Sequence, residues 1–371
     1  MSAGKRVSFA ICRIGPGCSA GAAEVSSGTV ALHGDTAAEE MEHARNRPGA
    51  RASGHRRPGR GGATLATAER MIMDHVEFDR EPPANLTTMV MAFGGWIDAG
   101  RAATGALRHL NRDLRAARLA RIDPEEFFVF TLERPEVRMR ADGDRDILWP
   151  LSEFFAWRPE DGGDGLLLFC GPEPHQKWRT YTNAFLDVAA RCGVKRIVSL
   201  GALLAGAPHT RPVRVTARCT DPASRSLLEA WGIYRPPTYE GPTGISSVVL
   251  DAAEKRGMQH VGFMGQAPHY LQDSENPAAI QILVSYVARL LNLSPDMSHF
   301  DEAIQDFRTQ CDKAVARDRA TREHVRKLEQ EYDAAVGEER QPLPGGELDS
   351  EKLMQELQDF LRKQREGGAA G

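Results

Sequence analysis

Four polar side chains, placed in separate loops, have the chemistry of acid–base catalysts: Asp98, Glu173, Glu240 and His269. A carboxylate can act as a general base, and an imidazole can exchange a proton near neutral pH. If the four loops converge, these side chains will line one polar cleft. Such a cleft would suit a small-molecule hydrolase or a phosphorylase-like enzyme.

The sequence does not identify a reaction for this cleft. It has no G-x-S-x-G elbow, no H-E-x-x-H helix, no G-x-G-x-x-G fingerprint and no metal-ligand spacing. Gly95 and Gly100 have the spacing of a P-loop, but Arg101 and Ala102 stand where Lys and Ser or Thr are needed. Asp98 would also repel a phosphate. We therefore expect a pocket without a metal and without a cofactor, and no confident catalytic residue.

Composition indicates a cytoplasmic protein. The chain has 371 residues, 41% of them hydrophobic, a net charge of −4 and a pI near 6.3. This charge gives no general reason to expect nucleic-acid binding. Six scattered cysteines without a C-x-x-C pair are typical of reduced thiols. No apolar stretch approaches the roughly 18 residues that span a bilayer, so we expect no membrane contact.

Residues 1–72 differ from the rest of the chain. They are rich in Gly, Ala and Arg, and residues 1–70 hold 10 basic and 6 acidic side chains. A segment with so few periodic apolar residues cannot offset its ordering entropy, so we expect disorder. Two further interpretations stay open: a basic tail that binds an acidic partner or nucleic acid, or a start codon assigned too early, with Met71 or Met73 as the true start.

From residue 73 to 293, apolar strands alternate with amphipathic helices, which predicts an α/β domain. Several helices are marked by N-caps at Asp98 and Thr243, an N-cap and N1 pair at Asn276 and Pro277, and a helix end near Gly193. The expected fold is a mainly parallel sheet with helices on both faces, whose ligands would bind beyond the carboxyl ends of the strands. We expect strands over residues 87–93, 127–132, 165–170, 194–200, 213–217 and 260–264, and helices over 102–110, 178–189, 245–255 and 277–291.

Residues 294–371 read as a helical hairpin or arm. A 4-3 apolar spacing runs from Phe300 to Ala335, weakened in its middle by Asp318 and Thr321. After a Pro/Gly turn, a second amphipathic helix places Leu353, Leu357, Phe360 and Leu361 on one face. The apolar seam either packs on the α/β body or forms a coiled coil between chains.

The loop sequences, taken in order, resemble the proteasome assembly chaperone 2 family over about residues 85–293. The resemblance rests on the segments Gly95–Gly105, Gly171–Trp178, Leu200–Pro212, Tyr239–Ile245 and Ala267–Pro277. From the positions of these loops we expect a ligand or partner cleft formed by Gly95, Trp96, Asp98, Gly171, Glu173, Gly201, Tyr239, Glu240, Gly241, Thr243, Gly244, Pro268, His269 and Tyr270.

The resemblance also implies an α/β fold similar to nucleoside phosphorylases, and homo-oligomers that help proteasome subunits assemble without a cofactor. This chain has Ile97 where many members have Asn, which removes a polar group from the first loop. It ends in Gly367–Gly371 and lacks the hydrophobic-Tyr-X tail with which archaeal relatives dock into a proteasome ring. From the resemblance as a whole, we expect a homo-oligomeric, chaperone-like protein that binds proteasome subunits or another protein complex. The alternative is the enzyme described above.

Overall fold

The computed structural model describes residues 72–271 and 274–340, with side chains up to Val336. Apart from Ile72, the extension predicted over residues 1–72 lies outside this range, as does the helix predicted around Leu353–Leu361. Within the described residues, no helix is long and apolar enough to cross a membrane.

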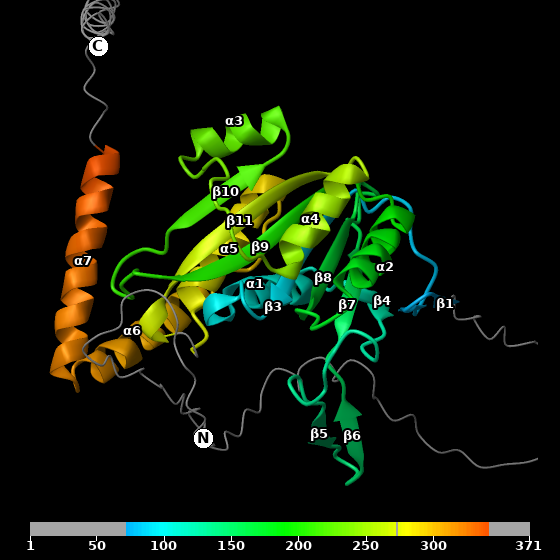
Figure 1. Cartoon of the computed structure of the whole chain (residues 1–371), viewed down its shortest axis with the longest axis horizontal. Helices are drawn as coiled ribbons and strands as arrows, with labels where there is room; N and C mark the ends of the chain where they lie inside the picture. Colours follow the sequence, from blue (N-terminus) through cyan, green and yellow to red (C-terminus); the bar gives the residue numbers. More distant parts are fainter. Residues whose placement is uncertain (1–71, 272–273, 341–371) are drawn as a thin grey trace, which may run out of the picture. The chain divides into compact units, whose positions relative to one another are not determined.

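A mixed β-sheet forms the centre of the described domain (Figure 1). Its four middle strands are parallel, and the strands on both flanks are antiparallel. The predicted fold class is confirmed, since the parallel strands hold the centre. In spatial order the strands are β1 (Ile72–Met73), β2 (Val76–Phe78), β4 (Ala117–Ile122), β7 (Ser152–Trp157), β8 (Leu166–Pro172), β3 (Thr88–Gly94), β9 (Arg196–Ala205), β11 (Gln259–Pro268) and β10 (Val215–Cys219).

Helices cover both faces of the sheet because the central strands are apolar on both sides. In β3, Met89, Met91 and Phe93 belong to one core cluster, whereas Val90 and Ala92 belong to the other. The first cluster includes α2 (Trp178–Arg191) and α4 (Ile245–Lys255), and the second includes α1 (Ala102–Asp113) and α5 (Pro277–Leu291). Helix α3 (Pro222–Ala230) packs beside β10 (Figure 1).

The capping signals at Asn276 and Gly193 are confirmed. Asn276 accepts a hydrogen bond from the Ala279 N–H (3.1 Å), and Pro277 is the first residue of α5. Gly193 follows α2 with φ +79°, the left-handed conformation that closes a helix. Helix α4 spans the predicted residues, Ile245–Lys255. Each of these signals acts within a few residues of the helix end that it determines.

The strand predicted over residues 127–132 is wrong. The segment forms consecutive turns, with the N–H groups of Phe127 and Phe128 bound to the Pro124 carbonyl. Phe127 and Phe128 are buried because they anchor this turn in the core, so their apolarity reflects burial rather than a strand. The sheet positions are instead filled by β4 and β7, whose charged residues obscured the strand pattern.

A β-hairpin that the sequence did not predict projects from the sheet (Figure 1). It consists of β5 (Glu136–Met139) and β6 (Arg145–Leu148). The pairing places Val137, Met139 and Ile147 on one face, where each is more than half exposed (62%, 61% and 57%). A two-stranded hairpin is marginally stable by itself in water. This exposed apolar face is therefore a candidate contact surface for another protein chain.

The predicted seam is divided between two helices, α6 (Phe300–Val315) and α7 (Arg319–Arg340). Asp318 lies at the break and accepts hydrogen bonds from the N–H and hydroxyl of Thr321 (2.7 and 2.6 Å). The two residues that weaken the heptad pattern thus form a helix cap. The seam packs on the α/β body of the same chain through Phe307, Cys311, Val315, Val325 and Leu328, which cluster with Tyr270 and Leu271.

Candidate functional site

Asp98 binds the first turn of helix α1 as predicted, although the N-cap position itself belongs to Arg101. Its Oδ1 accepts hydrogen bonds from the N–H groups of Ala103 (2.8 Å) and Thr104 (3.1 Å), and its Oδ2 accepts one from the Thr104 hydroxyl (2.6 Å). Burial raises the pKa of Asp98, and these hydrogen bonds oppose that rise. Both carboxylate oxygens are therefore engaged in holding the turn between β3 and α1.

Glu173 holds the start of a different helix. Its Oε1 accepts a hydrogen bond from the Ile245 N–H (2.7 Å), the first residue of α4. A carboxylate at a helix N-terminus is favourable because it faces the positive end of the helix dipole. Thr243, which the sequence indicated as the N-cap, is exposed, and the N-cap position belongs to Gly244. That assignment is wrong because Glu173, 72 residues away in sequence, supplies the acceptor.

Two glycines allow this contact. A Cβ at Gly244 would lie 2.9 Å from Glu173 Oε1, and one at Gly95 would lie 3.3 Å from Glu173 Cβ. Gly95 also has φ +113°, which favours glycine. The same Gly244 position lies 3.7 Å from Trp96 Cε3. We call Gly95, Trp96, Asp98, Glu173 and Gly244 the turn cluster. The sequence left open whether these loops meet, and the structure brings Gly95, Glu173 and Gly244 together.

Several further predicted cleft residues are exposed or pack between strands. Tyr239 is 72% exposed and Glu240 is exposed too, as is Trp96 of the turn cluster at 58%. The Tyr239 hydroxyl donates to the Pro242 carbonyl (2.9 Å), and it lies near Gly241. Gly171 lies against Ser152 of β7, and Gly201 makes room for Met264, so both glycines serve strand packing.

His269 belongs to a different group, in which three rings meet the two C-terminal helices. His269 begins the short 3-10 turn η2 (His269–Leu271), next to the buried Pro268 at the end of β11. Its Nδ1 lies 3.1 Å from the Ala205 carbonyl oxygen, and its Nε2 lies 3.1 Å from His324 Nε2 on α7.

Tyr270 and His209 complete this contact. The Tyr270 hydroxyl accepts the His209 N–H (2.9 Å) and pairs with His209 Nδ1 (2.7 Å), while His209 Nε2 binds Asp312 Oδ1 on α6 (3.0 Å). Burial raises the pKa of Tyr270, so its hydroxyl keeps its proton. We call His209, His269, Tyr270, Asp312 and His324 the arm joint.

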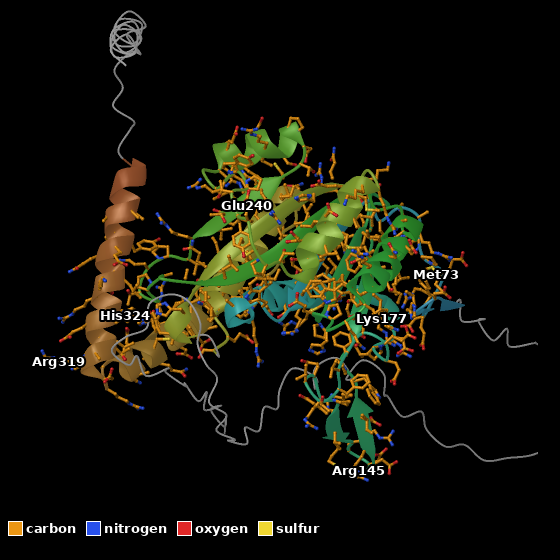
Figure 2. The ribbon with its side chains drawn as sticks, in the orientation of Figure 1. Met73, Arg145, Lys177, Glu240, Arg319 and His324 are labelled. Atoms are coloured by element: carbon orange, nitrogen blue, oxygen red, sulfur yellow. The ribbon has the colours of Figure 1, made fainter. Side chains whose placement is uncertain are left out.

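The four candidate catalytic side chains do not gather at one point. Glu173 follows β8 and His269 follows β11, and β3 and β9 lie between these strands. Three strand spacings separate them, roughly 14 Å. Figure 2 shows Glu240 in the loop before α4 and His324 on α7, in different parts of the domain. A catalytic role for any of the four remains a prediction.

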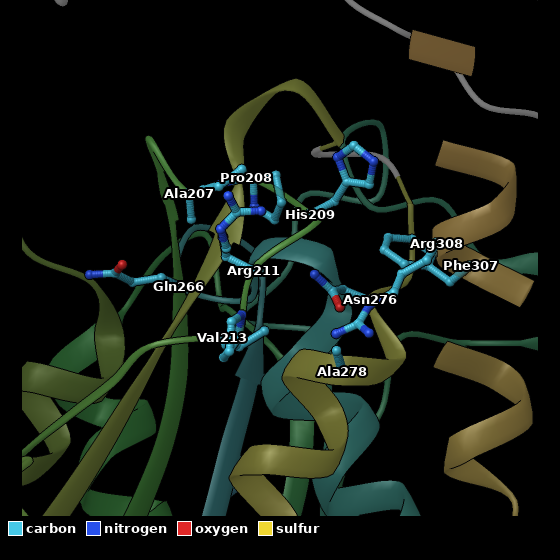
Figure 3. A pocket seen from close by; sticks show the side chains of 12 residues that line it. Ala207, Pro208, His209, Arg211, Val213, Gln266, Asn276, Ala278, Phe307 and Arg308 are labelled. Atoms are coloured by element: carbon cyan, nitrogen blue, oxygen red, sulfur yellow. The ribbon is translucent and has the colours of Figure 1, made fainter. Parts of the chain in front are cut away.

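A shallow hollow lies beside the arm joint (Figure 3). It has room for little more than a water molecule. Among the predicted cleft residues, only Pro268 lines it. In the part of the chain that the structure describes, no three His, Cys, Asp or Glu side chains are grouped to hold a metal ion. The full lining is Ala207, Pro208, His209, Arg211, Pro212, Val213, Gln266, Pro268, Asn276, Ala278, Phe307 and Arg308.

The sequence did not reveal which residues of α6 and α7 contact the body. Arg211 pairs with Asp333 through two hydrogen bonds (2.8 and 2.7 Å), and the Tyr332 hydroxyl donates to the Pro212 carbonyl (3.0 Å). The heptad seam was the available signal, because it predicted an apolar face that needs a partner. It could not show which loop of the body that face would meet.

Comparisons with known proteins agree on one family. The PAC2 family model matches residues 92–315. The PAC2 family protein of Streptomyces avermitilis is 32% identical, with 64% of this chain and 99% of that chain covered at a TM-score of 0.58. A proteasome-assembly chaperone homologue of Mycobacterium tuberculosis is 33% identical, with 64% and 100% covered at a TM-score of 0.57.

A more distant structure shares the fold alone. It is an archaeal proteasome activator of Pyrococcus furiosus, 20% identical, with 64% of this chain and 97% of that chain covered at a TM-score of 0.52. No curated protein matches the chain.

Proposed function

Because this chain belongs to the PAC2 family, we propose that it is a homo-oligomeric partner-binding protein that assists the assembly of proteasome subunits. The observation that carries the proposal is the similarity of this chain to two actinobacterial proteins over their whole length. One of them is described as a proteasome-assembly chaperone homologue. This role rests on binding surfaces rather than on a reactive centre.

Exposed apolar side chains support the proposal. The hairpin face of Val137, Met139 and Ile147 is exposed, and so are the aromatic side chains of Trp96, in the turn cluster, and Tyr239, in the loop before α4. Soluble monomers rarely expose contiguous apolar patches, and aromatic residues are frequent at protein interfaces. We assign the hairpin face to self-association, because two copies of one flat apolar face are complementary about a two-fold axis.

The enzymatic alternative has less support. The carboxylates of Asp98 and Glu173 bind the N-termini of α1 and α4, and His269 is held by Ala205 and His324. Each group therefore has a structural task. If Glu173→Gln or His269→Ala abolished turnover of a small molecule that the intact protein converts, the enzymatic alternative would replace our proposal.

Self-association can be tested with a charge-matched pair of variants. Val137→Lys combined with Ile147→Lys adds two positive charges to the apolar face, whereas Glu136→Lys adds the same net charge to the opposite face. Light scattering after size-exclusion chromatography should give an oligomer for the intact protein and for Glu136→Lys, and a monomer for the double variant. A monomeric intact protein at tens of micromolar would contradict homo-oligomerisation, and an unchanged double variant would contradict the assigned surface.

Subunit binding is tested separately. Unassembled proteasome subunits of an actinobacterium are mixed with the full chain, and the masses of the eluted species are measured. A complex of defined stoichiometry is expected. Separate elution of every subunit would contradict the assembly role, whatever the oligomeric state of this chain.

A further inference from the structure

The arm joint combines histidines with a dissociable contact between two parts of one chain. The α6–α7 arm, residues 300–336, meets the body through the apolar cluster of Phe307, Cys311, Val315, Val325 and Leu328. A Cβ atom added at Gly206 would lie only 3.4 Å from Leu328 Cδ2, so the seam fits closely against the loop after β9. At the edge of this apolar contact, two imidazole rings face each other.

The geometry assigns the hydrogen between the facing nitrogens to His324. His269 Nδ1 can only donate to the Ala205 carbonyl oxygen (3.1 Å), which leaves His269 Nε2 as an acceptor in the neutral ring. His324 Nε2, 3.1 Å away, must then donate to it. The rings lie at 82° to each other with centroids 5.1 Å apart, so the contact is a hydrogen bond rather than a stack.

One added proton leaves a hydrogen bond in place, because the ring that stays neutral can present an unprotonated Nε2 to the N–H of the other ring. Protonation of both rings removes it, since two N–H donors then face each other with no acceptor between them. It also places two positive charges beside Lys327, which Glu331 only partly offsets. The closed contact therefore binds fewer protons than the open one.

We propose that the His269–His324 pair is a proton-sensitive latch, which holds the α6–α7 arm closed on the body near neutral pH and releases it in mild acid. The proposal does not depend on the partner of the protein. Release would expose the apolar cluster beneath the arm, a surface suited to an apolar helix of another protein.

Burial of His324 and the facing His269 favour this direction. Burial, followed by the facing His269, lowers the pKa of His324 from its ordinary value of 6.5. A base whose pKa is lower in the closed state stabilises that state fully above pH 6.5, and the contribution declines as the pH falls below 6.5. Lys327 and Glu331 of α7 act on His324, and Tyr270 of the body contacts both rings of the pair. The titratable and charged groups around Tyr270 are His209 from the body, Cys311 and Asp312 from α6, and Glu329 from α7.

Cys311 reports whether the arm is open. It belongs to α6 and is fully buried between the arm and the body, whereas Cys192 is fully buried in the core beside α2. The full-length protein is treated with a dithiodipyridine reagent in the presence of EDTA between pH 8 and 5.5, and labelling is read peptide by peptide. Dividing the Cys311 rate by the Cys192 rate removes most of the intrinsic pH dependence of thiol reactivity. Carboxylates remain largely ionised in this range.

We expect the ratio to rise about tenfold between pH 7.5 and 5.5, as one additional proton bound over about one pH unit would produce. His324→Gln keeps an N–H donor but cannot titrate, so its ratio should stay low and constant. His75→Gln, a histidine outside the arm joint, should behave like the intact protein. A constant ratio in the intact protein, or an unchanged rise in His324→Gln, would overturn the proposal.

If His324→Gln loosens the arm at every pH, its labelling ratio cannot be compared with that of the intact protein. In that event His269→Gln decides, because its carbonyl oxygen can replace Nε2 as the acceptor. Loss of the pH dependence in His269→Gln supports the latch, and a persistent tenfold rise overturns it.

Discussion

In the turn cluster, Asp98 and Glu173 bind backbone N–H groups at the starts of two helices, whereas in the arm joint His209 and His269 bind side chains of α6 and α7. The turn cluster secures helices whose apolar faces belong to the two large cores. The arm joint borders a smaller, separate apolar cluster. We infer that the turn cluster opens only when the body unfolds, whereas the arm can open while the body stays folded.

The largest effect is expected from a variant that weakens the packing of the arm without destabilising the body. Leu328→Ala should weaken arm packing by about 2–3 kcal/mol, because it leaves a cavity against Gly206 at a position only 5% exposed. Cys311 should then be labelled much faster while the unfolding midpoint of the body hardly changes. Arg326→Ala, on the exposed face of α7, serves as the control. A Leu328→Ala protein in which Cys192 becomes reactive together with Cys311 would show that the arm and body unfold as one unit.

Removing the Asp98 cap should affect the whole body. Asp98→Ala deletes three hydrogen-bond acceptor contacts at the start of α1 and should lower the free energy of unfolding by about 1–2 kcal/mol. Asp98→Asn keeps an oxygen for the Ala103 and Thr104 N–H groups and should cost less. Denaturant titration measures both variants. Equal stability of Asp98→Ala and the intact protein would contradict the importance of this cap.

Glu173 should have a smaller effect in the same direction. Glu173→Ala removes the acceptor for the Ile245 N–H and should cost about 1 kcal/mol, since one hydrogen bond is lost at a partly exposed site. Glu173→Gln retains an oxygen there and should lie between Glu173→Ala and the intact protein. Hydrogen exchange of the first turn of α4 is the local readout, and unchanged exchange there in Glu173→Ala would count against the contact.

The smallest effect is expected for the surface ion pair of the arm. Arg211→Ala breaks the contact with Asp333 on α7, but exposed ion pairs contribute about 1 kcal/mol or less. The labelling rate of Cys311 should rise less than fivefold, and 1 M NaCl should reduce the difference. Arg319→Ala removes an ion pair within α7 and should leave Cys311 labelling unchanged. A larger effect than that of Leu328→Ala would mean that charge, rather than apolar packing, holds the arm.

The contrast between the regions also explains what the sequence could predict. The caps at Asp98 and Asn276, and the helix end at Gly193, were predictable because each acts on N–H or carbonyl groups a few residues away. The turn over residues 127–132 was misread, because burial alone does not distinguish a strand from a core-anchoring turn. The Glu173 cap was missed for a related reason: its acceptor comes from another loop.

The contacts of the arm joint could not be predicted from residues close together in the sequence. His209 meets Asp312 across 103 positions, and His269 meets His324 across 55. The 4-3 spacing predicted an apolar face without identifying the surface that it covers. The single cleft expected from Asp98, Glu173, Glu240 and His269 required a strand order in which β8 and β11 are neighbours, and β3 and β9 separate them.

Assembly kinetics test the proposed function most directly. Unassembled proteasome subunits of an actinobacterium are mixed with increasing amounts of the full-length protein, and the appearance of peptidase activity is followed over time. We expect faster assembly together with a transient complex that contains this chain. An unchanged assembly rate, with no complex detected at any ratio of the components, would contradict the proposal that this PAC2 family protein assists proteasome assembly.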